Sequence, residues 1–194
     1  MRLPVSALAL SALVLVTGCD SGNGLEDFGP PRTARILKVS VDAAPLRQED
    51  GDAWDPGGGE PDIYFRLFDD FVDYEADPQG ARLSARVDDD IVRPVSSGDA
   101  WYENVRTADF SLVWDVDPGF VIRDLTDPLY LALFDYDPFD DDDPMAYSED
   151  FTLLDFAPTR VDGTADVIVL DGFDRGGVDL GSDFRVRLTV QFDD

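Results

Sequence analysis

The chain contains a series of short segments in which apolar residues occupy every second position. In the first of these, Leu37, Val39 and Val41 alternate with polar residues and are expected to share one face. Because side chains along a strand point alternately to opposite faces, this spacing predicts a half-buried β-strand. Comparable segments are expected at residues 63–67, 83–87, 110–116, 129–133, 151–153, 166–170 and 184–192.

Turn-forming clusters such as DPGGGEP, DPQG and DRGG separate these segments. No window of ten or more residues combines helical spacing with capping residues. About eight short strands, each with one apolar face, are buried most simply when two sheets pack face to face. The sequence therefore predicts an all-β protein built as an antiparallel, eight-stranded β-sandwich.

The charge of the chain is strongly negative and is spread over its whole length. A formal net charge of −27 comes from 36 Asp and 6 Glu against 14 Arg and the single Lys38. A field of this sign repels nucleic acid, so nucleic acid is excluded as a partner. The preference for Asp over Lys is similar to that of proteins from salt-adapted, halophilic bacteria. Surface adaptation is thus the competing explanation for any acidic cluster.

The N-terminal sequence MRLPVSALALSALVLVTGC has the anatomy of an export signal: one basic residue and an apolar stretch too short to span a bilayer. Its end resembles the lipobox of bacterial lipoproteins, in which cleavage before the cysteine leaves that residue lipidated. Cys19 is the only cysteine, so it has no disulfide partner within the chain. We expect a signal peptide at residues 1–18, a lipidated Cys19 with a flexible tether at 19–33, and one domain at 34–194.

The segment LYLALFDYDPFDDDDPMAY, residues 129–147, changes abruptly from an apolar strand to a run of carboxylates. Its acids include Asp135, Asp137, Asp140 and Asp143. Calcium takes six to eight oxygen ligands, which closely spaced Asp residues in a loop can supply. An EF-hand loop does not fit, because the central Gly and terminal Glu are missing. The run predicts a calcium site, with surface adaptation as the alternative.

The spacing of these four acids resembles the third calcium-binding loop of C2 domains, a family of calcium- and phospholipid-binding β-sandwiches. ILKVSVDAAPL resembles the opening strand of that family, and PDIYFRL resembles a later strand, with Asp62 in a ligand position. The resemblance implies a C2-like Greek key with bound calcium as cofactor. In the long first loop it leaves the ligand open among Asp50, Asp52 and Asp55.

Two departures from the C2 pattern lie beside the expected site. Ile63 replaces a proline of the first-loop motif, and residues 144–146 replace the Ile-Gly that normally follows the third loop. C2 domains often place an apolar residue at a loop tip that enters the bilayer, and Phe139 occupies that position. Arg82 and Arg86 lie where the family has a basic patch, although pairing with nearby acids is the expected use of their charge.

The tryptophans allow two interpretations. Trp114 lies on the inward face of its expected strand and is assigned to the core. Trp54 and Trp101 lie in or beside loops, where they can stack on a sugar or simply cover an end of the sandwich.

The chain has no His, and Cys19 is assigned to the anchor, so the usual general base and thiol nucleophile are missing. We therefore expect a binding module and not an enzyme. The expected function is that of a lipoprotein held in the bacterial cell envelope by its lipid anchor. Its calcium-binding module would interact with phospholipid, an envelope protein or polysaccharide. The alternative is a calcium-independent adhesion or carbohydrate-binding sandwich.

Overall fold

The computed structural model describes residues 31–55, 58–69, 81–85, 101–138, 142–157, 165–174 and 176–193. Within these ranges no helix is both long and apolar enough to cross a membrane. Three 3-10 helices occur there, η1 (Thr107–Asp109), η2 (Leu153–Phe156) and η3 (Gly181–Asp183). The strands are β1 (Thr33–Ala43), β2 (Ile63–Phe68), β3 (Leu83–Ser84), β4 (Leu112–Ile122), β5 (Tyr130–Asp135), β6 (Asp143–Ser148), β7 (Ala165–Leu170), β8 (Gly172–Asp174) and β9 (Arg185–Asp193).

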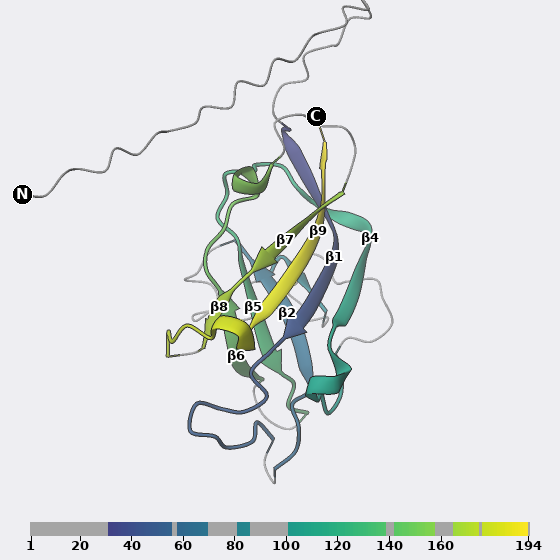
Figure 1. Cartoon of the computed structure of the whole chain (residues 1–194). Coiled ribbons are helices and arrows are strands. Elements are labelled where there is room, and N and C mark those ends of the chain that lie inside the picture. The colour runs from purple at the N-terminus through teal and green to yellow at the C-terminus, as the bar shows by residue number, and fades with distance from the viewer. Residues whose placement is uncertain are drawn as a thin grey trace, which may run out of the picture.

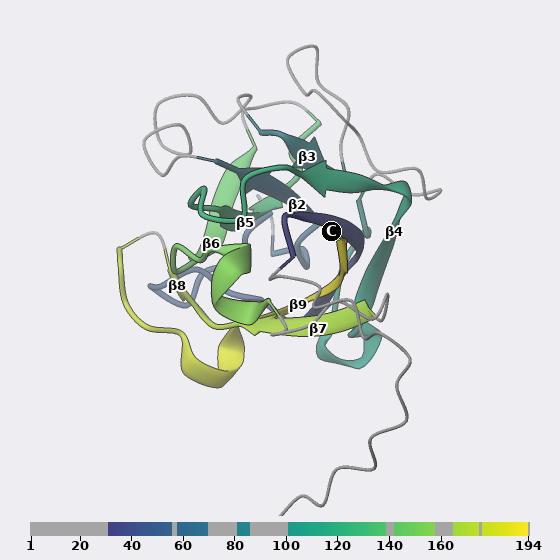
Figure 2. The same ribbon diagram turned by 90° about the horizontal axis from the view of Figure 1, so that it is seen from above.

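The strands form two sheets, with the orders β4-β1-β9-β7 and β3-β2-β5-β6-β8 (Figure 1). All pairs of neighbouring strands are antiparallel. Seen from above, the sheet containing β1 and β9 faces the sheet containing β2 and β5 (Figure 2). Among the described strands, only the β2–β3 and β5–β6 connections stay within one sheet. The expected all-β class with two antiparallel sheets is confirmed.

The described residues form nine strands, one more than expected. β6 and β8 were not among the expected strands, whereas the segment expected as a strand at 151–153 forms only an isolated bridge at Phe151 and the start of η2. β7 belongs to the first sheet and ends at Leu170, and β8 begins two residues later in the second sheet. Gly172 starts β8 where a Cβ atom would lie 2.4 Å from the carbonyl oxygen of Tyr147 and 2.6 Å from the ring of Phe184. Only glycine permits this close approach of the backbone.

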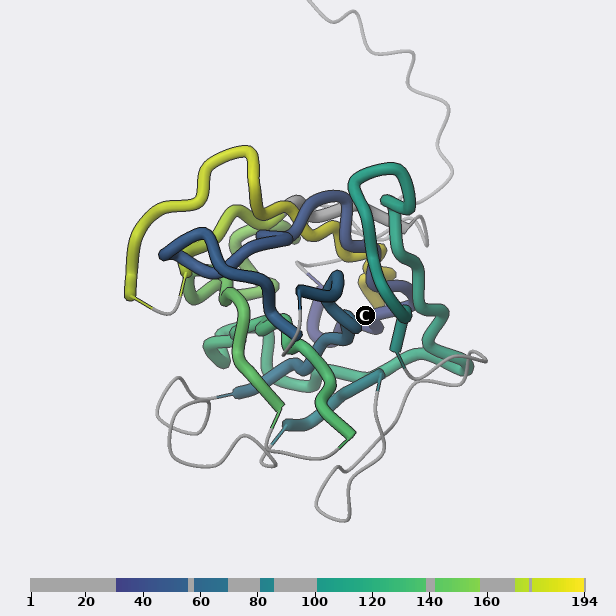
Figure 3. The backbone as a smooth tube through the Cα atoms, turned by 90° about the horizontal axis from the view of Figure 1, so that it is seen from below, coloured from purple at the N-terminus to yellow at the C-terminus, as the bar shows by residue number. Residues whose placement is uncertain are grey.

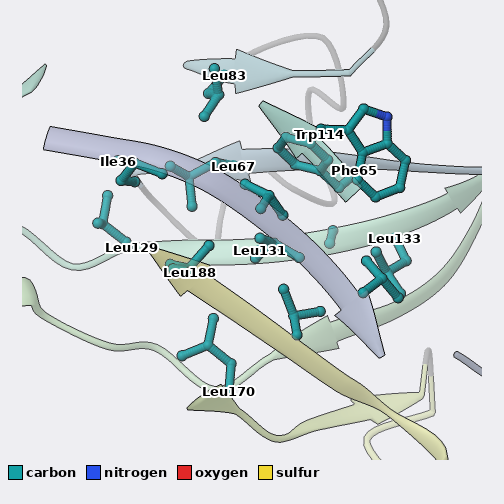
Figure 4. Packing of buried hydrophobic residues seen from close by; sticks show 14 of the residues in the cluster. Ile36, Phe65, Leu67, Leu83, Trp114, Leu129, Leu131, Leu133, Leu170 and Leu188 are labelled. Atoms are coloured by element: carbon teal, nitrogen blue, oxygen red, sulfur yellow. The ribbon is translucent and has the colours of Figure 1, made fainter. Parts of the chain in front are cut away.

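The core lies between the two sheets and is built from the apolar faces that the alternation predicts (Figure 4). All five apolar residues of the 184–192 segment are buried, each with an exposed fraction of 2% or less. Trp114 is 1% exposed and packs edge to face on Phe65 with ring centroids 5.2 Å apart. Its assignment to the core is confirmed. Burial of these faces from water stabilises the sandwich.

The expected face of β1 is wrong in its first half. Ala34 and Ile36 are buried there, whereas Leu37 is only half-buried. The pairing of β1 with both neighbouring strands shifts register between Ile36 and Lys38. A β-bulge at this position moves the alternation by one residue, so that Val39 lies on the inner face again as expected.

Two strands of the second sheet are covered on both faces. All six residues of β2 are buried, including Arg66, whose guanidinium carbon lies 5.4 Å from the ring centroid of Tyr64 and 5.1 Å from that of Phe134. In β6, the neighbouring residues Met145 and Ala146 are both buried. β2 was expected because Ile63, Phe65 and Leu67 occupy alternate positions, whereas β6 has no such spacing of apolar residues and is absent from the strands expected from the sequence.

The bulge in β1 predicts unequal costs for two adjacent truncations. Ile36→Ala should lower the free energy of unfolding by about 2–5 kcal/mol, because it removes fully buried methyl groups. Leu37→Ala should lower the free energy of unfolding by less than about half of that amount, because Leu37 is only half-buried. Urea unfolding of both variants measures the difference, and a larger loss for Leu37→Ala would place the bulge elsewhere.

Candidate cation-binding loops

The acidic residues expected to bind calcium lie at the end of the sandwich where β1 and β5 finish and β2 and β6 begin. Register places Asp135 between Ile63 on one neighbouring strand and Asp143 on the other. In Figure 1 this end lies at the bottom, away from the C-terminus. Figure 3 looks onto it and shows the loop between β1 and β2 beside the chain that leads from β5 to β6.

Asp135 is the central acidic residue of this end. It is 0% exposed, although its side chain is a carboxylate on the middle strand of three. Its Oδ1 accepts a hydrogen bond of 2.6 Å from the backbone N–H of Asp62. Its Oδ2 is buried and has no hydrogen-bond partner among the described residues. A buried carboxylate oxygen without a partner is costly, so this atom needs a proton or a cation.

The pKa of Asp135 shows the same imbalance. Burial is the largest cause that raises this pKa to about 7, and the hydrogen bond from Asp62 opposes the rise. The neighbouring carboxylates of Asp55, Asp137 and Asp62 contribute to the raised value, since they repel the ionised form of Asp135. The structure therefore brings three of the other six acids expected to bind calcium within electrostatic reach of Asp135.

Asp62 and Asp55 are positioned by the loops around them. The Oδ1 of Asp62 accepts a 2.7 Å hydrogen bond from the N–H of Asn104, which has a left-handed φ of 51°. Asparagine adopts this conformation more readily than most residues. Burial and the nearby Asp62 raise the pKa of Asp55. Gly59 permits this position, because a Cβ there would lie 2.5 Å from the Oδ2 of Asp55.

Asp142 has a structural role that the sequence did not indicate. Its Oδ2 accepts a 2.6 Å hydrogen bond from the hydroxyl of Tyr64, and its Oδ1 accepts one of 3.2 Å from the N–H of Asp137. One acid of the run thus ties the chain between β5 and β6 to β2. The outward position of Tyr64 on an alternating strand is the only signal for this contact in the sequence.

The other expected ligands are placed differently. Asp50 accepts a 3.0 Å hydrogen bond from the N–H of Asp52 and lines a cleft with Asp143. Of the alternatives for the first loop, Asp55 is the one that interacts electrostatically with Asp62 and Asp135. Asp140, with Phe139, Cys19 and Arg86, lies outside the described residues.

The loop tryptophans and Arg82 have partners within the protein. The indole N–H of Trp54 donates a 2.9 Å hydrogen bond to the carbonyl of Pro45. The ring of Trp101 lies 4.2 Å from that of Tyr136, centroid to centroid. Both side chains therefore pack within the loops. Arg82 forms a 2.9 Å ion pair with Asp69, which is the local pairing expected of its charge.

The side chains of this end offer hard oxygen donors, which suit calcium in type. The orphaned Oδ2 of Asp135 points to a missing partner of positive charge. Within the part of the chain that the structure describes, however, no three acidic side chains converge closely enough to hold a metal ion. The oxygen donors are of the type that binds a cation, but the acidic side chains of the described residues are not close enough together to coordinate one.

The fold and this cluster define a β-sandwich with an acidic loop end. No family model matches the sequence, and no curated protein matches it. Among solved structures, a C2 domain of plant extended synaptotagmin 1 aligns with 81% of this chain and 93% of that domain, at 14% sequence identity and a TM-score of 0.37. A likeness this distant carries no argument about ligand or activity.

The raised pKa of Asp135 predicts a pH dependence of stability. The carboxyl has a pKa of about 7 in the folded chain against 3.8 ordinarily, so the folded state binds more protons between these values. The resulting stabilisation is present below pH 4 and is lost as the pH rises through about 7. With chelator present, the free energy of unfolding of the wild type should fall by roughly 2–3 kcal/mol between pH 5 and pH 8, and Asp135→Asn should not show this fall.

Urea unfolding at the two pH values measures this difference. Asp127→Asn, an exposed substitution at the opposite end of the sandwich, serves as the control and should follow the wild type. Identical pH profiles for the wild type and Asp135→Asn would show that Asp135 does not titrate in this range.

Proposed function

We propose that the protein is a cation-binding β-sandwich module whose loop end takes calcium. The observation that carries the proposal is the carboxylate of Asp135, which is fully buried and whose Oδ2 receives no hydrogen bond from the part of the chain that the structure describes. Three further carboxylates surround it closely enough to raise its pKa. A bound divalent cation offsets such repulsion and supplies the missing partner.

Calcium fits this end better than magnesium does. Calcium accepts six to eight oxygens in flexible geometries, whereas magnesium demands a nearly ideal octahedron. The acids here come from a long loop and from two strand ends, Asp55 and Asp62 on one side and Asp135 and Asp137 on the other. Binding would draw the loop between β1 and β2 toward the end of β5. The cation would thereby act as a clamp that shapes the loop surface.

The proposed role is binding at the cell envelope. Outside the cytoplasm calcium is plentiful, so a site of modest affinity stays loaded and serves as a structural element. The shaped loops would contact phospholipid, an envelope protein or polysaccharide, as the resemblance of the acidic spacing to C2 domains suggests. In the carbohydrate-binding alternative, Trp54 and Trp101 would be the sugar platforms, but both pack against loop residues.

Calorimetric titration of the full chain in mild detergent tests the cation site. Wild-type protein should bind calcium saturably with a dissociation constant of about 0.1–1 mM. Asp135→Asn should weaken binding at least tenfold by removing the central charge, an effect of about 1.4 kcal/mol or more. Calcium should also raise the unfolding temperature of the wild type, because it binds only the folded chain.

Asp127→Asn is the matched control, since it removes one carboxylate far from the loops and should bind calcium as the wild type does. Because Asp135→Asn is expected to fold at least as stably as the wild type above pH 7, lost binding cannot be ascribed to unfolding. Equal weak binding in all three proteins, or none, would make the acids a surface adaptation.

We also propose that lipid on Cys19 holds the protein at a membrane of a bacterial envelope. The lipobox-like sequence before this lone cysteine supports the proposal. In cells fed labelled palmitate, wild-type protein should be labelled and sediment with membranes. Cys19→Ser should lose the label and leave the membrane fraction, while Ser21→Ala should behave as the wild type. Membrane retention of unlabelled Cys19→Ser would exclude the anchor.

A further inference from the structure

A cleft of about 850 Å³ opens at the same end of the sandwich, beside the acidic cluster. Its walls come from the end of β1, the following loop, η1, the start of β6 and the segment around η3. Asp135 does not line it. The volume lies in the upper part of the range of about 300–1,000 Å³ that is usual for ligand sites.

Part of the lining of this cleft is apolar, and this part is called the floor. Five large apolar side chains line the cleft and pack on or belong to the core of the sandwich. They are Leu46, Trp54, Phe110, Met145 and Leu180. Such a surface favours the apolar part of a ligand, because burying it removes both surfaces from water.

The charged part of the lining, called the rim, is mainly negative. Six carboxylates line the cleft against one guanidinium, that of Arg47. They belong to Asp42, Glu49, Asp50, Asp143, Asp174 and Asp183.

Only one of the six carboxylates has an ion-pair partner within the described residues. Asp42 is bound by Arg187, with Nε 2.5 Å from Oδ2 and Nη2 2.8 Å from Oδ1. Burial alone would raise the pKa of Asp42, but the hydrogen bonds from Arg187 and Ser111 outweigh it and lower the pKa. Asp174 and Glu49 accept hydrogen bonds from backbone N–H groups, which leave their charges uncompensated. Among the described residues, the lining therefore combines a surplus of negative charge with apolar side chains.

We propose that this cleft binds a peptide segment of a partner protein in which Lys or Arg adjoins apolar residues. The apolar side chains fill the floor, and the cation meets the carboxylates of the rim. Charge alone does not select this ligand, since the whole surface of the chain is acidic and attracts any cation weakly. A cleft lined by both apolar side chains and carboxylates favours a ligand that carries apolar and cationic groups in adjacent positions.

Calorimetry with short capped peptides tests the proposal. The probe is Gly-Leu-Arg-Leu-Gly, compared with Gly-Leu-Glu-Leu-Gly, Gly-Ser-Arg-Ser-Gly and N-acetyl-arginine amide, at about 0.1 M salt to limit screening. The first peptide should bind saturably with one site per chain. The glutamate peptide should not bind, and the serine peptide and the single amino acid should bind at least about tenfold more weakly.

Two variants locate the site without touching the cation cluster. Asp183→Asn removes a rim charge, and Leu180→Ala shortens a floor side chain. Each substitution should lower the affinity for the leucine-arginine peptide at least about fivefold. Asp127→Asn should leave its affinity unchanged. Each titration is run with chelator and again with calcium, so that failure of the cation site does not affect the result.

Three outcomes would overturn the proposal. The first is no saturable binding of the leucine-arginine peptide. The second is equal binding of the serine-arginine peptide or of the amino acid amide, which would mean that charge alone is recognised. The third is unchanged affinity in both Asp183→Asn and Leu180→Ala, which would place the peptide elsewhere on the acidic surface.

Discussion

The structure depends on the burial of one apolar face from each sheet against the other. β9 provides the most regular face, and its inward residues from Phe184 to Phe192 are almost fully removed from water. The opposing face comes from β2 and β5 and includes Phe65, which meets Trp114 of β4. Since this contact fixes both sheets, it also fixes where their strands end. The acidic residues of the loop after β1 and of the chain after β5 meet at one end for that reason.

The strand pattern could be predicted from the sequence wherever a strand has one apolar and one polar face. It was correct for β9 and for Trp114, but wrong at Leu37, because a bulge is a property of the pairing and not of the alternation. β6 was missed because Met145 and Ala146 face opposite sides and are both buried. Where a second layer covers the outer face, polarity no longer marks the outside.

The candidate site was predictable in part for similar reasons. Asp135 and Asp137 follow directly from the end of an apolar strand, so their place at the end of the sheet is implied by the strand itself. The choice between Asp50 and Asp55 could not be predicted from the sequence, because it depends on how the long loop folds. The approach of Gly59 to Asp55 is a tertiary contact that residue spacing does not encode.

The passage from β7 to β8 through the single residue Asp171 means that one stretch of chain belongs to both sheets. A sliding motion of one sheet over the other would have to bend the backbone at this point, where Gly172 is already packed against Tyr147 and Phe184. This direct passage from β7 to β8 links the two sheets through the backbone. This link disfavours sliding of the sheets relative to each other and leaves the loops as the parts of the sandwich that can move most easily.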